Sequence, residues 1–406
     1  MADLPLKGVK VLDLSRLLPG PFCSLLLADL GAEVLKVEDT GMGDYVRWTP
    51  PYVGGEEAKA SGTHSVQFAA LNRNKQSIQI DLKAVAGKEI LLKLVAEHDV
   101  VLESFRPGVL EKLNVGYDQM KTVNPGIVYC AITGYGQDGP FKLRAGHDMN
   151  YLGLNGLLGL TGAKGGAPVQ AAGQIADIGG GAQMAAIAIL AALVKKQATG
   201  KGAELDISMT DGALSWLAMP AAAALAGDVR ERGDVDLAGK WACYMPYEAA
   251  DGWISCGALE PKFWQAFARG VDREDLIEKQ FELAGSDGWA EIAEVFKTKT
   301  RAEWAAFNDE HDCCIEPILD IDEALASDLV RERGMVTEVD QPGIGPVGQL
   351  APPFVIDGAR PDRREPAPGF GEHTNAVLES LGYSAEEIAS LRESGAVAGV
   401  EGVPAS

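Results

Sequence analysis

The segment Val9-Lys10-Val11-Leu12-Asp13-Leu14 decides the fold class, because it is a short apolar strand candidate that leads directly into a helix signal. The helix signal is Pro19-Gly20-Pro21 and the apolar residues that follow it. The same alternation continues to about residue 135, with strands expected at 32–37, 77–81, 100–103 and 126–131 and a helix at 85–97. Short apolar strands separated by helices predict a parallel sheet with both faces covered. The first third of the chain is therefore expected to form an α/β domain.

The rest of the chain indicates a second, smaller domain. A chain of 406 residues can hold two cores, since a single core stops growing at about 250–300 residues. Tryptophans concentrate between residues 241 and 304, where Asp251-Gly252 predicts a hairpin turn and helices are expected from Pro261, Trp289 and Ala302. We predict a large α/β domain beginning with 1–207, a linker helix and linker at 208–235, a small α+β domain at 236–325, a return linker at 326–350 and a C-terminal return to the large domain at 351–406.

Two Gly- and Pro-rich stretches are expected to be irregular. Residues 41–65 predict a long surface loop, and residues 338–370 predict an irregular crossing back to the first domain. Two short helices, at 373–381 and 384–394, are expected to end the fold.

The composition excludes several classes of function. The formal net charge of −22 argues against a nucleic-acid-binding surface, although a polyanionic small ligand needs only a local basic pocket. The six cysteines form no Cys-x-x-Cys pair and the five histidines are isolated from one another, so we expect reduced thiols, no metal site and a cytoplasmic location. The N-terminal residues lack a signal-peptide pattern, and the longest apolar tract, 185–194, is shorter than the ~18–20 residues of a membrane span.

Three segments carry acidic or basic residues that could take part in chemistry. His147-Asp148 precedes an apolar helix expected at 151–160, and a histidine at such a junction can act as a general base. Composition alone favours the simpler interpretation, in which Asp148 caps the helix and His147 lies on the surface. Asp177, between apolar residues and a glycine run, is equally consistent with a proton-transferring carboxylate of raised pKa and with a helix cap. Glu260, just before a helix, is more simply a first-turn carboxylate.

Four basic residues lie near strand ends and could form a phosphate pocket in an acidic protein. Arg16 and Arg106 each follow a strand, at the carboxyl edge of the sheet where ligands of open α/β sheets bind. Arg73 and Lys75 just precede another strand. Taken one at a time, each is more simply a solvated surface charge, so the pocket is expected only if they converge.

Two nucleotide and hydrolase motifs are absent from the sequence. There is no Gly-x-x-x-x-Gly-Lys-Ser/Thr phosphate loop and no Gly-x-Ser-x-Gly nucleophile elbow. These absences weigh against a nucleotide hydrolase and against an α/β-hydrolase.

The chain resembles the class III CoA-transferase (CaiB/BaiF-like) family, which includes the α-methylacyl-CoA racemases. The matching segments run in order along nearly the whole chain: 8–16, 29–34, 72–77, 105–108, 200–202 and 371–374. The resemblance implies a large domain with a Rossmann-like parallel sheet, a smaller α+β domain and an interlocked homodimer. It also implies an acyl-CoA substrate, with Arg16, Arg73, Lys75 and Arg106 on the side of the CoA phosphates and adenine, and no cofactor beyond that CoA moiety.

Two chemistries compete within the family that the chain resembles. Transferases use an aspartate nucleophile, which matches Asp148, and pass through acyl-anhydride and thioester intermediates. Racemases resemble proton-transfer enzymes, with a histidine directly before that aspartate, a second carboxylate in an Asp-x-Gly-Gly segment and a glutamate in Gly-Ala-x-Glu-Pro. This chain has all three, as His147, Asp177 and Glu260. The resemblance therefore implies a two-base racemase, in which the Asp148 backbone N–H holds the enolate oxygen and Glu260 binds His147, with CoA transfer through Asp148 as the alternative.

Two departures from the racemase pattern bear on the substrate. Residues 239–244 replace the usual Gly-Gly-Ala-Pro-x-Tyr stretch, which implies a reshaped acyl pocket. Asp39 occupies a place where racemases often have an arginine, so phosphate contacts must differ.

Overall fold

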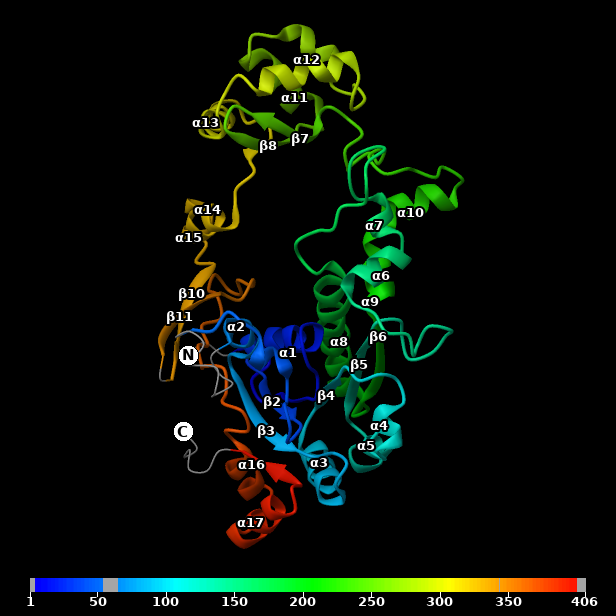
Figure 1. The fold of residues 1–406 in the computed structure, drawn as a ribbon, viewed down its shortest axis with the longest axis vertical. Coiled ribbons are helices and arrows are strands. Elements are labelled where there is room, and N and C mark those ends of the chain that lie inside the picture. Colours follow the sequence, from blue (N-terminus) through cyan, green and yellow to red (C-terminus); the bar gives the residue numbers. More distant parts are fainter. Residues whose placement is uncertain (1–3, 54–64, 343, 400–406) are drawn as a thin grey trace. The chain divides into compact units, whose positions relative to one another are not determined.

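A computed structural model of the protein describes residues 4–53, 65–342 and 344–399. The chain forms two compact units, which are described separately below (Figure 1). The first unit comprises 1–155, 173–216 and 334–406, and the second comprises 156–172 and 217–333. The segment 156–172, which the predicted boundaries assign to the large domain, thus groups with the second unit, and the chain re-enters the first unit at 334 rather than 351.

The first unit is built on a seven-stranded sheet with the order β12-β3-β2-β1-β4-β5-β6. Its strands pair in parallel except for β12, which pairs with β3 in the antiparallel direction. The order 3-2-1-4-5-6 is that of dinucleotide-binding α/β folds, so the predicted Rossmann-like sheet is confirmed. The strands are β1 (Lys10–Asp13), β2 (Glu33–Glu38), β3 (Lys75–Ile80), β4 (Val100–Glu103), β5 (Val128–Thr133), β6 (Ala203–Ser208) and β12 (Val397–Ala398).

Helices cover the two faces of this sheet because its strands bury both sets of alternating side chains. One face, including Leu12, Leu35 and Val101, packs on a core formed with a first group of helices. The opposite face is covered by a second group, whose members contact one another. The first group is α3 (Val85–Glu97), α4 (Val109–Lys112), α5 (Tyr117–Val123), α16 (Thr374–Ser380) and α17 (Ala385–Glu393), and the second is α1 (Pro19–Asp29), the π-helix η3 (Ile175–Gln183) and α8 (Met184–Thr199).

Helices η3 and α8 are continuous, and together they form a core helix of the first unit. Among the described residues, the stretch Ile175–Thr199 is the one helix long and apolar enough to cross a membrane by length and composition, and half of its most apolar window is buried inside the protein. It packs against α1, β5 and β6. These contacts account for its apolar character, because one side of the helix covers the sheet.

The second unit has its own aromatic core. Its sheet has the antiparallel order β7 (Tyr244–Ala249), β8 (Gly252–Gly257) and β9 (Ile315–Pro317). The predicted hairpin at Asp251-Gly252 is confirmed. The rings of Phe267 and Phe296 stack with centroids 4.9 Å apart, and the Trp304 ring packs against both. The helices around this core are α11 (Pro261–Gly270), α12 (Asp287–Phe296) and α13 (Arg301–His311). The unit also contains α7 (Leu157–Leu160), α10 (Ala218–Leu225), α14 (Ile321–Ala326) and α15 (Asp328–Glu332).

Two expectations of irregular structure are wrong in part. Within 338–370, β10 (Val336–Gln341) and β11 (Gly345–Leu350) form an antiparallel hairpin in which Val339 and Val347 alternate with exposed residues and are buried. Within 41–65, residues 54–64 lie outside the described residues. The preceding part contains a 3-10 helix, η1 (Tyr45–Trp48), whose Arg47 is fully buried and ion-pairs with Glu38 at 2.6 Å. Buried charge pairs of this kind leave no hydrophobic signal in the sequence.

Candidate active site

His147 stands at the start of helix α6 (Asp148–Leu154). It is the N-cap residue, with an extended backbone, and its N–H donates to the Oδ1 atom of Asn150 at 3.0 Å. Its imidazole is exposed. The helix begins one residue earlier than the simpler sequence interpretation requires, because Asp148 is its first residue rather than its cap.

The Asp148 carboxylate is buried and caps a different helix. Its side chain is 5 % exposed, and Oδ1 accepts hydrogen bonds from the backbone N–H groups of Ala176 at 2.6 Å and Asp177 at 3.0 Å. These N–H groups belong to the first turn of η3, where a helix has no acceptors of its own. One carboxylate therefore ties the His147 segment to the Asp177 segment, which lie about 30 residues apart in the sequence.

Asp177 is a partly buried carboxylate inside the first turn of η3, whose N-cap is Gln174, so the cap interpretation of Asp177 is wrong. Burial, and to a smaller extent the charge of Asp148, raise the pKa of Asp177 to about 6, while His147 acts in the opposite direction. The structure thus brings His147, Asp148 and Asp177 together. A carboxyl group that titrates near neutral pH can both accept and return a proton.

The glycines after Asp177 allow η3 to approach helix α9 (Met209–Leu214). A Cβ atom on Gly180 would lie 2.6 Å from both the Met209 carbonyl oxygen and the Ala213 nitrogen. One on Gly212 would lie 2.0 Å from the Gly180 oxygen. The two helices are in backbone contact, so the glycine run fixes the position of the segment that carries Asp177.

Tyr151 is a neighbour of this cluster that sequence reasoning did not single out. Its hydroxyl donates to the Gly146 carbonyl at 2.5 Å, and its ring meets the Tyr135 ring edge-on with centroids 5.1 Å apart. Burial raises the pKa of Tyr151 above its usual value, and the charge of Asp177 adds to this effect. The sequence could have pointed to Tyr151, because it lies one helical turn after His147 and both residues are therefore at the start of α6.

Glu260 belongs to the second unit. It is the N-cap of α11, with Pro261 at the first helical position, and it is exposed. Its carboxylate makes no capping hydrogen bond to that helix.

The four predicted basic residues do not converge on one pocket. Arg73 is 4 % exposed and its guanidinium pairs with Asp29 at 2.6 Å. Lys75 is 3 % exposed, donates to the Pro21 carbonyl and the Asn72 side chain at 2.9 Å, and has its pKa lowered by burial to about 7. Because both side chains are committed to internal partners, Arg16 and the exposed Arg106 remain as candidates for phosphate contact.

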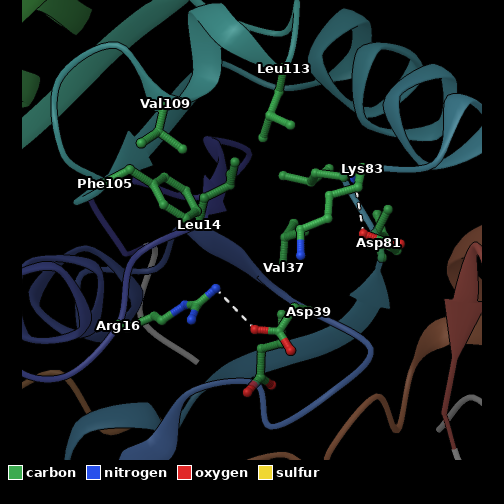
Figure 2. Close-up of a pocket in the computed structure, with 12 residues that line it drawn as sticks. Leu14, Arg16, Val37, Asp39, Asp81, Lys83, Phe105, Val109 and Leu113 are labelled. Atoms are coloured by element: carbon green, nitrogen blue, oxygen red, sulfur yellow. Dashed lines mark hydrogen bonds and ion pairs between the residues drawn. The ribbon is translucent and has the colours of Figure 1, made fainter.

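Arg16 lines a pocket at the carboxyl ends of β1 to β4, where the strand order reverses between β1 and β4 (Figure 2). Ligands of open α/β sheets bind at such switch points. The Arg16 guanidinium lies 3.0 Å from Asp39 and 5.7 Å from the centre of the Phe105 ring. The apolar lining residues are Leu14, Val37, Ile80, Phe105, Val109 and Leu113. Within the described part of the chain, no group of three or more potential ligands could hold a metal ion.

Comparisons with known proteins find relatives that match nearly the whole chain. The sequence profile of CoA-transferase family III matches residues 6–374. The human α-methylacyl-CoA racemase is 34% identical over 400 residues, covering 96% of each chain, and the human succinyl-CoA:glutarate CoA-transferase is 33% identical, covering 97% of this chain and 90% of its own. The crystal structure of a CAIB/BAIF family protein from Brucella suis superimposes with a TM-score of 0.79 at 31% identity, covering 93% of this chain and 100% of that one.

Proposed function

We propose that this chain, which belongs to CoA-transferase family III, is an α-methylacyl-CoA racemase that interconverts (R)- and (S)-2-methylacyl-CoA thioesters. Members of the family include both racemases and CoA-transferases, so membership alone does not select between the two reactions. The observation that carries the choice is the pairing of an exposed imidazole, His147, with a carboxyl group of pKa about 6, Asp177, through the buried Asp148.

Racemisation needs two proton-transfer groups that act on opposite faces of C2. The thioester acidifies the C2 proton, but an unaided base at neutral pH cannot remove it at a useful rate. One of His147 and Asp177 removes the proton, and the other delivers a proton to the opposite face of the resulting enolate. The Asp177 carboxyl, with a pKa of about 6, can both accept and return a proton, and an imidazole is a common general acid and base. This reaction requires no cofactor beyond the CoA of the substrate.

The enolate oxygen needs hydrogen-bond donors at the moment its charge develops. The backbone N–H of Asp148 is the first of α6, and the first N–H groups of a helix have no intrahelical acceptor and lie at its positive end. A donor of this kind is worth about 3–4 kcal/mol to an oxyanion transition state. The Asp148 N–H is therefore the proposed oxyanion contact, and Glu260 is kept as a further proposed catalytic residue on the strength of its Gly-Ala-x-Glu-Pro context.

The environment of Asp148 argues against its use as a nucleophile. An attacking carboxylate must present an oxygen to the thioester carbon, whereas this carboxylate is 5 % exposed and already accepts two backbone hydrogen bonds. CoA transfer through Asp148 is the second candidate, supported by the transferase relatives. Both backbone hydrogen bonds end on Oδ1, so this transfer would have to proceed through the Oδ2 atom of a largely buried carboxylate.

We also propose that the protein acts as a homodimer in the cytoplasm. On helix α8, Ile187 and Val194 lie seven residues apart on one exposed face and are 59% and 67% exposed. Leu214 and Trp216, near the end of α9, are exposed as well. An apolar face of this kind on one unit is typical of a surface that is covered by another chain, and a second copy is the occupant that we propose.

Trapping experiments separate the two reactions. A racemase needs no acceptor acid and is not inactivated by hydroxylamine after acyl-CoA is added. We expect this result, with His147→Ala severely impaired. Inactivation by hydroxylamine, together with a dead Asp148→Asn variant and an active His147→Ala variant, would identify a transferase instead. If the chain neither exchanges the C2 proton with solvent nor transfers CoA to an acceptor acid over a broad panel of acyl-CoA thioesters, it is a binding protein.

A further inference from the structure

The pocket at the β1–β4 switch point contains an internal ion pair at the place where a nucleotide ligand would bind (Figure 2). Its apolar lining, with Phe105 on one side, suits a flat adenine ring. The charged groups that line it are Arg16 and Lys83 with the carboxylates of Glu38, Asp39 and Asp81.

Asp39 is held by its own chain. Its Oδ1 atom accepts from the N–H groups of Gly41 at 2.8 Å and Gly43 at 3.2 Å, and its Oδ2 atom lies 3.0 Å from the Arg16 guanidinium. The carboxylate is therefore fixed at the carboxyl end of β2, and Arg16 must share its charge with it.

The pair is exposed enough for a ligand to compete with it. The side chains of Arg16 and Asp39 are 36% and 37% exposed. Ion pairs of this exposure contribute little net free energy, so a phosphate can displace the carboxylate from Arg16. The displaced carboxylate still stands beside the phosphate, however, and repels it.

The other charges in the pocket do not offset this repulsion. Burial alone would raise the pKa of Glu38, but its ion pair with Arg47 outweighs burial and holds the pKa of that carboxyl below its usual value. The charge of Glu38 is therefore balanced by Arg47. The Asp81 carboxylate accepts a hydrogen bond from the backbone N–H of Lys83 at 2.9 Å. Asp81 thus adds a second carboxylate to the pocket, near Lys83, the other cation in its lining besides Arg16. In open α/β folds, an acidic residue at the end of the second strand favours a ribose with free hydroxyl groups, and an arginine there accommodates a ribose phosphate.

We propose that this pocket takes the adenosine part of CoA and that Asp39 is a specificity-determining residue, which reduces the contribution of the 3′-phosphate on its ribose by occupying Arg16. The ligand class rests on the proposed function, but the effect of Asp39 is on binding and does not depend on the reaction catalysed. The enzyme then binds 3′-dephospho-CoA nearly as well as CoA.

The test is calorimetric titration of the full chain with CoA and with 3′-dephospho-CoA. Asp39→Asn removes the charge while its side-chain oxygen still accepts from Gly41 and Gly43, so the loop keeps its anchor. We expect the variant to bind CoA about fivefold to tenfold more tightly and 3′-dephospho-CoA with unchanged affinity. The exposed Asp118→Asn, on α5 outside the pocket, is the control for net charge and should change neither affinity.

A second variant identifies the cation. In the Arg16→Gln background, Asp39→Asn should increase the affinity for CoA less than it does in the wild-type chain, because the phosphate has lost its cationic partner and only the direct repulsion by Asp39 is relieved. The proposal is overturned if Asp39→Asn changes the ratio of the two affinities by less than about threefold, a difference below 1 kcal/mol, or if neither compound binds. Because binding is measured without turnover, a failed racemase assay leaves this result intact, and the two proposals fail separately.

Discussion

The two charged regions of the first unit differ in how they hold their charges. At the junction of α6 and η3, Asp148 is buried and fixed by two backbone N–H groups, and the neighbouring Asp177 has a raised pKa. At the β1–β4 switch point, Arg16 and Asp39 pair while more than a third of each side chain is exposed. Electrostatic interactions strengthen as water is excluded. The junction is therefore suited to proton transfer, and the pocket is suited to reversible recognition.

The largest effect is expected from removing either proposed base. His147→Ala and Asp177→Asn should each lower the rate of racemisation by about 10²–10⁴-fold, because a positioned acid or base contributes that much. Polarimetry or chiral separation of the acyl product measures the rate. Lys142→Ala, an exposed change on the loop before the site, is the matched control and should keep full activity. Near-normal racemisation by either base variant would remove that residue from the mechanism.

The second-largest effect is expected from disturbing the contact between η3 and α9. Gly180→Ala places a Cβ atom 2.6 Å from backbone atoms of Met209 and Ala213, and we expect a loss of at least about 1–3 kcal/mol in the free energy of unfolding. Gly153→Ala on α6 meets nothing within 4 Å and should be neutral or slightly stabilising. Urea denaturation compares the two. Equal stability of both variants would contradict the close approach of the helices.

The junction also predicts a pH dependence of stability. Asp177 has a folded-state pKa of about 6 against an ordinary value of 3.8, so the folded chain binds more protons between these values. Its contribution to stability is present below about pH 4 and is lost as the pH rises through 6. Asp177→Asn should therefore gain about 1–2 kcal/mol of stability relative to wild type between pH 4 and pH 8. Denaturation of both proteins at the two pH values measures this gain, and a constant difference would contradict the raised pKa.

The smallest of these effects concerns the tuning of Asp177 by Asp148. Asp148→Asn keeps an oxygen that can accept from Ala176 and Asp177 but removes the negative charge that raises the Asp177 pKa. The limb of the pH–rate profile that belongs to Asp177 should move to lower pH, by less than one unit, since burial is the larger cause of the shift. A limb at the wild-type position would show that the two carboxylates are not coupled.

The difference between the two regions also explains what the sequence could predict. Strands of the large sheet, the Asp251-Gly252 hairpin and the helices from Pro261 onward follow from local pattern and turn chemistry, and the structure has them. The burial of Arg73 and Lys75 could not be predicted, because it depends on Asp29 and Pro21, which approach only after the sheet has formed.

The site divides in the same way. The resemblance selected His147 and Asp177, and the structure places them together. The role of the Asp148 side chain, however, depends on backbone N–H groups 28 and 29 residues away, which no spacing rule reveals. The π-helix was missed for a related reason, since Gly179 to Gly181 disfavour a helix locally and are stabilised by the contact with α9.

The central claim is two-base proton transfer at C2, and exchange in deuterated water tests it most directly. The enzyme is incubated with pure (S)- or (R)-2-methylacyl-CoA and no acceptor acid, and both the chirality and the deuterium content at C2 are followed. The account predicts loss of chirality from either enantiomer with deuterium appearing at C2. Retention of chirality and of the C2 proton, with turnover only when an acceptor acid is added, would contradict it.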